Sequence, residues 1–325
     1  MRRGIACAGN WIVDIVHSID AWPAKSDLVR ITDEVEGTGG GAANVLLALA
    51  AFQTGLPLWA MGLIGQDRHA ATVRAAIAAA GADATHLAAT DAAPTAHTHV
   101  MNLAGDSRTF FYHPGTNDLL SDTDLPVQDV AASGARLFYL GYLNLLGAMD
   151  AIHDGSTGAA RVLARARAAG MITAVDLVST DRPTFRATVE AALPHTDYLF
   201  LNEGEAARAT GIAIAGAEDT AAMTAAAQQL IAGGVGQAVV IHSPALALWQ
   251  ARGAAPLILR PDPVPPDQII SPVGAGDAFA AGCLYGLHEG WQPDACLRLG
   301  HRAAAAALRG ATATEAIPPL AALMA

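Results

Sequence analysis

Cysteine and basic residues are both scarce in this chain of 325 residues. Its cysteines, Cys7, Cys283 and Cys296, lie far apart, and no pair has the spacing of a metal-binding or redox motif. We expect them to be buried free thiols in a reducing, cytoplasmic environment. Lysine and arginine number 19 against 30 acidic residues, a net charge of −11, which argues against binding to nucleic acids or anionic membranes.

Long apolar runs and linkers are missing as well. No apolar stretch reaches about 18 residues without a polar interruption, so we expect no transmembrane helix. The apolar run after Arg3 is interrupted by Asn10 and Asp14, which is typical of a first strand rather than a signal peptide. Hydrophobic residues make up 52% of the chain and charged residues 15%, a balance that supports a large core.

Apolar strands alternate with helices from residue 135 onward. Strands are expected at 137–143, 171–178, 198–202 and 237–242, with helices between them. This alternation predicts an α/β fold whose mostly parallel sheet is covered by helices on both faces. Polar segments at 17–35, and a hairpin over 95–112 with its turn at 104–107, predict a small sheet outside the main core.

The strongest local signal is Gly274-Ala275-Gly276-Asp277, followed by small and apolar residues up to 287. It predicts a tight turn that leads into the N-terminus of a buried helix. Such an N-terminus offers unpaired N–H groups and a positive dipole end, and glycines let an anion approach the backbone closely. Asp277 is then either a helix cap or a base beside a bound phosphate, and the turn alone leaves both open.

A second glycine-rich stretch, 37–44, also precedes an apolar helix and matches a loose dinucleotide-binding pattern. Residues 32–36 do not form the buried strand which that pattern needs, so an NAD-linked dehydrogenase is disfavoured. Asn44 can present its amide to a ligand hydroxyl or cap the helix.

Polar residues follow several expected strands. Asp14 comes near the end of a strand expected over 4–16, and Asn202 and Glu205 follow the strand that ends at 201. Because ligands of such sheets bind beyond the carboxyl ends of the strands, we expect these residues and the Gly274 turn on one rim.

These stretches together resemble the ribokinase-like, or PfkB, family of carbohydrate kinases over nearly the whole chain. The Gly274–Asp277 stretch is similar to the C-terminal signature of the family, and 39–44 with 62–67 to its N-terminal signature. Asn202-x-x-Glu205 matches its N-x-x-E motif. The resemblance implies one kinase domain over 1–325, a three-layer α/β/α fold, and a small β-sheet lid formed by strands from about 15–38 and 95–113.

The resemblance also implies an activity, the ATP-dependent phosphorylation of a hydroxymethyl group of a sugar. Asp277 would be the base, and the N–H groups of the turn would form the anion hole, namely those of Gly274, Ala275, Gly276 and Asp277. Asn202 and Glu205 would organise Mg²⁺ through water, together with the ATP phosphates. The substrate hydroxyls would be held by Asp14, Gly40, Gly41 and Asn44. A homodimer through the lid is expected.

The chain departs from the family pattern at two places. Ser271-Pro272 stands where Asp-Thr is common, which puts activation by K⁺ in doubt. His242-Ser243-Pro244 stands where a Thr or Lys contacts phosphate, so His242 is either a substitute contact to the nucleotide or a plain strand-end residue.

Two alternatives stay open. A nucleoside kinase needs an aromatic wall, for which the candidates are Trp11, Phe111 and Tyr112, although aromatic residues are only 5% of the chain. A catalytically silent binding protein is the other. His113 and Asn117 are further candidates for substrate contact from the small sheet.

Overall fold

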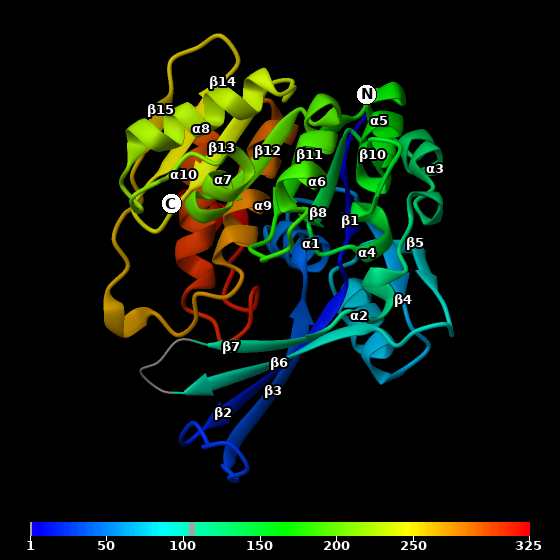
Figure 1. The fold of residues 1–325 in the computed structure, drawn as a ribbon, viewed down its shortest axis with the longest axis vertical. Helices are drawn as coiled ribbons and strands as arrows, with labels where there is room; N and C mark the ends of the chain where they lie inside the picture. Colours follow the sequence, from blue (N-terminus) through cyan, green and yellow to red (C-terminus); the bar gives the residue numbers. More distant parts are fainter. Residues whose placement is uncertain (1, 104–107) are drawn as a thin grey trace.

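A nine-stranded sheet forms the centre of the molecule (Figure 1). The computed structural model describes residues 2–103 and 108–325, so the turn predicted at 104–107 lies outside the described residues. Across the sheet the strands are β15 (Leu257–Leu259), β14 (Ala247–Ala251), β13 (Ala238–His242), β12 (Tyr198–Asn202), β11 (Ile172–Leu177), β8 (Leu137–Leu143), β1 (Ile5–Gly9), β4 (Leu58–Ile64) and β5 (Asp83–Ala89). The strands from β13 to β5 are parallel, and β14 pairs antiparallel with both β13 and β15. The predicted α/β class is confirmed.

Helices cover both faces of this sheet. One face carries α1 (Gly41–Ala51), α2 (Arg68–Ala79), α9 (Ala275–Glu289), α10 (Pro293–Ala307) and α11 (Leu320–Met324). The other carries α3 (Val127–Ala132), α4 (Gly147–Asp150), α5 (Gly158–Ala168), α6 (Phe185–Ala192), α7 (Glu203–Thr210) and α8 (Thr220–Ala232). Strand side chains alternate between the two cores: Tyr139 packs in the first and Phe138 and Leu140 in the second, as the two-residue period of a strand requires.

The small residues of α9 have a packing reason. A Cβ on Gly282 would lie 2.7 Å from the Cα of Gly300, so α9 and α10 touch backbone to backbone. Shorter elements complete the chain: β9 (Ile152–His153), β10 (Ser156–Thr157), and the 3₁₀ helices η1 (Gly115–Asp118), η2 (Asp122–Asp124), η3 (Leu193–His195) and η4 (Pro266–Gln268).

A separate four-stranded sheet lies below the main body in Figure 1. Its order is β3 (Ile31–Gly39), β2 (Ile12–Ile19), β6 (Ala96–Leu103) and β7 (Thr109–His113). The outer strand β3 is mostly exposed, consistent with its polar sequence, so the glycines after it do not follow a buried strand.

The prediction of a single strand over 4–16 is wrong. The strand is interrupted at Asn10 and Trp11, so that β1 belongs to the large sheet and β2 to the small one. Asn10 holds the crossing, because its N–H donates to the carbonyl of Gly141 and its Oδ1 accepts from the N–H of Tyr142. Asp14 therefore lies within the small sheet instead of ending a core strand.

The three cysteines are buried free thiols, as expected. Within residues 2–103 and 108–325, no helix combines the length and the apolar character that crossing a membrane would require.

Candidate active site

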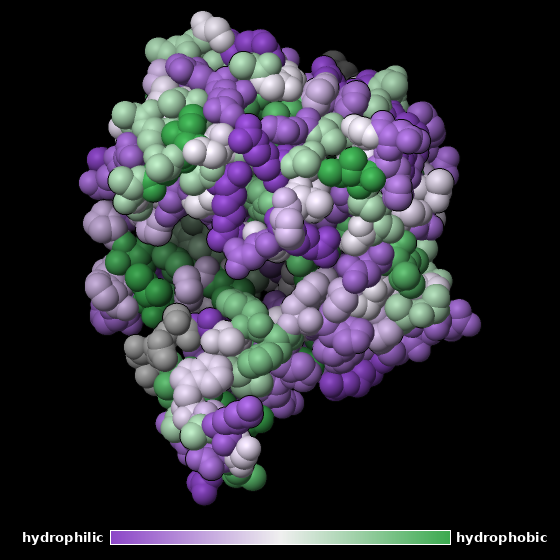
Figure 2. All heavy atoms as spheres, in the orientation of Figure 1, coloured by the Kyte–Doolittle hydropathy of each residue, from purple (hydrophilic) through white to green (hydrophobic). Residues whose placement is uncertain are grey.

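The carboxyl ends of the parallel strands meet at the edge of the large sheet that faces the small sheet (Figure 1). α9 begins at the same edge. Residues from β8, β11, β12, β13 and α9 line one cavity of about 240 Å³ there, among them Tyr142, Asp176, Asn202, His242 and Asp277. Figure 2 shows this face of the molecule hollowed between the main body and the small sheet. The predicted rim thus brings together side chains that are far apart in the sequence.

Asp277 lies at the centre of these contacts, in the first turn of α9, and is only 4% exposed. Its Oδ2 accepts a hydrogen bond of 2.9 Å from the amide of Asn44, which comes from α1. The hydroxyl of Tyr142 lies 2.8 Å from Oδ1 and 2.7 Å from Oδ2. The carboxylate is therefore held by side chains and does not serve as a helix cap, since the N-cap of α9 is Gly274.

Burial raises the pKa of Asp277 from its ordinary value of 3.8 to about 6, while the hydrogen bonds from Tyr142 and Asn44 lower it, and the nearby charges of Asp14 and Glu205 raise it further. Burial, and then the charge of Asp277, also raise the pKa of Asp176 well above its usual range. A carboxyl group with a pKa of about 6 is mostly ionised at neutral pH and still takes up a proton readily, which suits a general base.

The turn before Asp277 is fixed by Gly274. Its φ is +78°, and a Cβ there would lie 2.3 Å from the Cβ of Ala313, so only glycine fits. The N–H groups in the first turn of a helix have no acceptor within the helix and can bind an anion. One of the four predicted donors is partly used, because the N–H of Ala275 makes a 3.3 Å bond to the carbonyl of Pro272.

Asn202 and Glu205 form a capping box at the start of α7. The Asn202 Oδ1 accepts from the N–H of Glu205 at 2.8 Å, and the Glu205 Oε2 accepts from the N–H of Asn202 at 2.9 Å. The other oxygen, Oε1, accepts from the hydroxyl of Ser179 at 2.9 Å. Both carboxylate oxygens are already in use, and in the described part of the chain no group of three or more His, Cys, Asp or Glu residues is placed to hold a metal. An amide and a carboxylate whose oxygens each already accept a hydrogen bond fit a hard cation that is bound through bridging water.

His242 ends β13 beside the turn. Its ring packs against Phe279 of α9 in a tilted arrangement, with 5.2 Å between the ring centroids, and a Cβ on Gly276 would lie 3.3 Å from its Cε1. Burial, with a smaller contribution from His301, lowers its pKa to about 4, so the ring is neutral at pH 7. The hydroxyl proton of Ser243 is already used within the protein, because it donates to the carbonyl of Ala217 at 2.7 Å.

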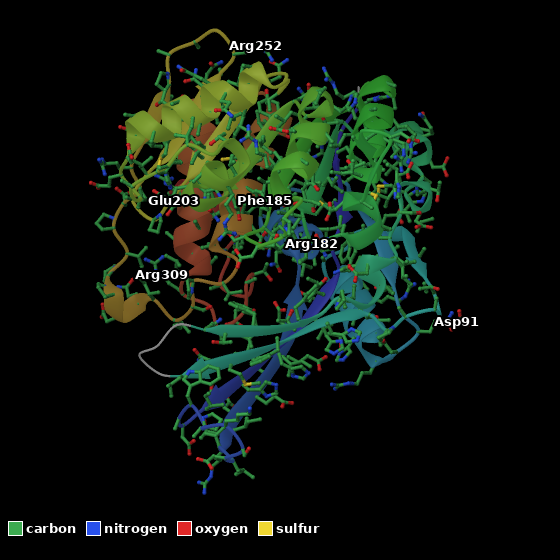
Figure 3. The ribbon with its side chains drawn as sticks, viewed as in Figure 1. Asp91, Arg182, Phe185, Glu203, Arg252 and Arg309 are labelled. Carbon is green, nitrogen blue, oxygen red and sulfur yellow. The ribbon has the colours of Figure 1, made fainter. Side chains whose placement is uncertain are left out.

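A larger cavity of about 630 Å³ adjoins the first and shares Asn202, His242 and Gly276 with it. Its wall includes apolar side chains from α9, α10 and the preceding loop, namely Phe279, Val264, Ile269 and Leu308. Glu203, labelled in Figure 3, lies on its rim at the start of α7. An apolar slot that ends at a helix N-terminus has the features of a site for a ligand with an apolar part and an anionic part.

Asp14 approaches the site from the small sheet. Burial raises its pKa to about 6, against a hydrogen bond with Thr98 and the charge of Arg108. A small pocket joins Asp14 and Arg108 to Val273 and to 311–313 of the main body. The glycines at the end of β3 and the start of α1 make room: a Cβ on Gly39 would lie 2.1 Å from Oδ2 of Asp14, and one on Gly41 would lie 2.7 Å from Cδ1 of Tyr142. Gly40, with φ +91°, is the N-cap of α1.

Some candidates lie elsewhere. His113 stacks on His97 at 4.8 Å, and His97 neighbours Thr98, so both rings lie on the face of the small sheet opposite to Asp14. Asn117 is buried, and its amide donates to the hydroxyl of Tyr112 at 2.9 Å. Trp11 is buried, and its Nε1 donates to the carbonyl of Met61, so it cannot stack on a ligand.

Tyr142 and Asp176 were not among the predicted site residues. Asp176 carried a usable signal, since it is an acid within the apolar strand 172–177, the same argument that singled out Asp14. Tyr142 carried no signal in the sequence.

Comparison with known proteins agrees with the family that the sequence motifs predicted. The family model described as pfkB family carbohydrate kinase matches residues 3–319. The chain is 24% identical over 322 residues to ribokinase from Arabidopsis thaliana, covering 97% of this chain and 78% of that protein.

Solved structures agree. The structure of Arabidopsis thaliana ribokinase with ribose and ATP matches with a TM-score of 0.82 and 21% identity, covering 100% of this chain and 98% of that one. Fructokinase with bound ATP from Xylella fastidiosa matches at 0.78 and 22%, covering 100% and 98%. An E. coli structure in complex with ATP and Mg²⁺ matches at 0.79 and 17%, covering 99% and 98%. At these identities the likeness establishes the fold.

Proposed function

This chain belongs to the pfkB family of carbohydrate kinases, and from that premise we propose that it transfers the γ-phosphoryl group of ATP to a hydroxymethyl group of a sugar. Family membership makes it a phosphotransferase with an alcohol group as acceptor. The observation that carries the finer proposal is the placement of Asp277. Its buried carboxylate lies in the first turn of α9 and lines the 240 Å³ cavity, which adjoins the 630 Å³ cavity at Asn202, His242 and Gly276.

The reaction assigned to this geometry is a direct displacement. The acceptor hydroxyl loses its proton to the Asp277 carboxylate as its oxygen bonds to the γ-phosphorus. The bond from that phosphorus to the bridging oxygen breaks, and ADP leaves with the electron pair. The N–H groups of Gly274, Gly276 and Asp277 would stabilise the charge on the transferred group. His242, which is neutral, would line the passage to the nucleotide.

Mg²⁺ would neutralise phosphate charge when bound. Asn202 and Glu205 would hold it through water, which agrees with their capping box, because a water bridge leaves those hydrogen bonds intact. The buried Glu205 carboxylate thus has a structural part in starting α7 and an electrostatic part at the phosphates.

The sugar would bind between the small sheet and the main body. Asp14 and Asn44 would accept and donate hydrogen bonds to its hydroxyls, and Gly40 and Gly41 would let it approach the backbone. The small sheet would act as a lid that keeps water from the phosphoryl group. The domain assigned to 1–325 thus has its lid in the strands from 15–38 and 95–113.

One observation keeps the nucleoside alternative in view. Tyr112 pairs with Thr98, which lies opposite Asp14, so its ring is on the substrate face of the small sheet. Phe111 is on the opposite face. A base could therefore stack only on Tyr112 among the three aromatic candidates.

The proposed homodimer rests on the small sheet. It carries exposed apolar side chains on its edge strands: Ile31 is 48% exposed, Phe110 55% and Phe111 53%. A second copy would cover them by edge pairing. Light scattering of the eluting protein should give twice the 33.2 kDa chain mass, and a Phe110→Glu variant should give the single mass.

A phosphorylation panel tests the activity. The purified protein is incubated with ATP, Mg²⁺, and in turn pentoses, hexoses, ketoses or nucleosides, and release of ADP is followed by a coupled assay. We expect turnover with at least one free sugar. Turnover with nucleosides alone would replace the proposal by the nucleoside kinase, and nucleotide binding without any turnover would indicate a silent homologue.

A further inference from the structure

The base of this site is contacted by two neutral donors. Asn44 donates to Oδ2 of Asp277 at 2.9 Å, and Tyr142 donates to both oxygens at 2.8 and 2.7 Å. Oδ1 receives the Tyr142 hydroxyl, and a carboxylate oxygen accepts two hydrogen bonds. One lone pair therefore remains for an acceptor hydroxyl. Beside it, the Oδ1 of Asn44 is buried and has no hydrogen-bond partner among the described residues.

Tyr142 is itself held in place from two sides. Its N–H donates to Oδ1 of Asn10, and its ring lies against α1 where Gly41 has no side chain to obstruct it. Burial and the charge of Asp277 keep the pKa of Tyr142 well above its usual range, so the hydroxyl stays protonated and can donate at neutral pH.

The surroundings of Asp277 would otherwise favour its neutral, inactive form. Burial comes first, and the nearby groups on other elements include three carboxyl groups and a neutral imidazole: Asp14 on β2, Asp176 on β11, Glu205 on α7 and His242 on β13. On β8, Tyr139 directs its hydroxyl to Asp176 at 3.4 Å. A hydrogen bond to a carboxylate favours its ionised form.

We propose that Tyr142 is a positioning residue for phosphoryl transfer, whose hydroxyl keeps the Asp277 carboxylate ionised and turned toward the acceptor hydroxyl. A phenol suits this task. It favours the ionised form of Asp277 but leaves the negative charge in place, whereas an arginine would neutralise that charge. It also leaves the lone pair on Oδ1 accessible. The proposal rests on the proposed function, because it concerns the base of that reaction.

The pH profile of kcat/KM tests the proposal. Tyr142→Phe keeps the ring and removes the hydroxyl, so the acidic limb should move up by about one to two pH units, the value of a hydrogen bond to a charged group. The rate above that limb should recover toward the parent, and the KM for ATP should not change. The matched control is Tyr139→Phe, on the same strand and fully buried, whose limb should stay where the parent has it.

A second variant guards against misfolding. Site-specific 3-fluorotyrosine at position 142 keeps the hydroxyl and makes it a stronger donor, so the limb should move down. The proposal is overturned if the acidic limb of kcat/KM stays at the parental pH in both Tyr142 variants. It is also overturned if the limb moves as far in Tyr139→Phe as in Tyr142→Phe. A parent protein without turnover on any acceptor is a different result, because it refutes the proposed function before Tyr142 is tested.

Discussion

Replacing Asp277 by asparagine should abolish turnover and, at alkaline pH, make the protein more stable. The substitution keeps the size of the side chain and one oxygen that can accept from Tyr142, but removes the buried charge. General-base catalysis is worth about 10²–10⁴ in rate, so kcat should fall by at least that range while ATP still binds.

The stability gain follows from the raised pKa. Folding lifts the pKa of Asp277 from 3.8 to about 6, which costs about 3 kcal/mol once the group is ionised, since one pKa unit is worth about 1.36 kcal/mol. Because the folded pKa is the higher one, the parent has its full stability below pH 3.8 and loses this amount as pH rises through about 6. Asparagine never ionises and so avoids this cost, but its NH₂ group faces the amide of Asn44 and loses that hydrogen bond. We therefore expect the free energy of unfolding to rise by about 1–3 kcal/mol at pH 8 and not to rise near pH 4.

Urea unfolding of both proteins at several pH values measures this directly. Asp150→Asn is the matched control, because Asp150 is also buried and burial raises its pKa to about 7, yet it lies outside the site and bonds the N–H of Leu146. This control should gain stability at alkaline pH and keep its turnover. A difference between Asp277→Asn and the parent that does not vary with pH, or a variant that still turns over at the parental rate, would refute the reasoning.

Further outcomes test the turn, the capping box and the small sheet. Gly274→Ala adds a Cβ that collides with Ala313 at a φ of +78° and should lower stability by about 2–4 kcal/mol in urea unfolding and kcat with it. Glu205→Gln keeps the cap but removes the charge, so it should raise the Mg²⁺ concentration needed for half-maximal rate while the melting temperature changes little. Burial lowers the pKa values of His69 and His99, so stability present above pH of about 6.5 is lost as pH falls. Hydrogen-exchange protection of β6 should therefore drop between pH 7 and pH 5, and a His99→Gln variant should show a smaller drop.

Much of the main body could be predicted from the sequence because its signals are local. The strand at 198–202 was predicted with the bounds that β12 has, since an apolar run ends there at the N-cap Asn202. The turn at Gly274 was predicted from its own small residues, and the small and apolar residues that follow predicted the buried helix α9. The division of residues 4–19 between two sheets was not predicted. β-propensity indicates that a segment is extended, but it does not indicate which sheet the segment joins. β5 was also missed, since its exposed, mixed residues lack an apolar run.

The catalytic geometry shows why Tyr142 lies beyond such reasoning. β8 and β11 pair regularly up to Leu140 and Val175, and they pair again at Leu143 and Leu177. β8 therefore has one residue more than β11 in this interval, so the register between the two strands shifts here. An extra residue in one strand of a pair turns a side chain away from the direction that strict alternation gives it. Tyr139 and Tyr142 stand on one strand, yet one reaches Asp176 and the other Asp277. Alternation alone assigns side chains along β8 by parity, and only the pairing with β11 reveals the extra residue that aims Tyr142 at the base.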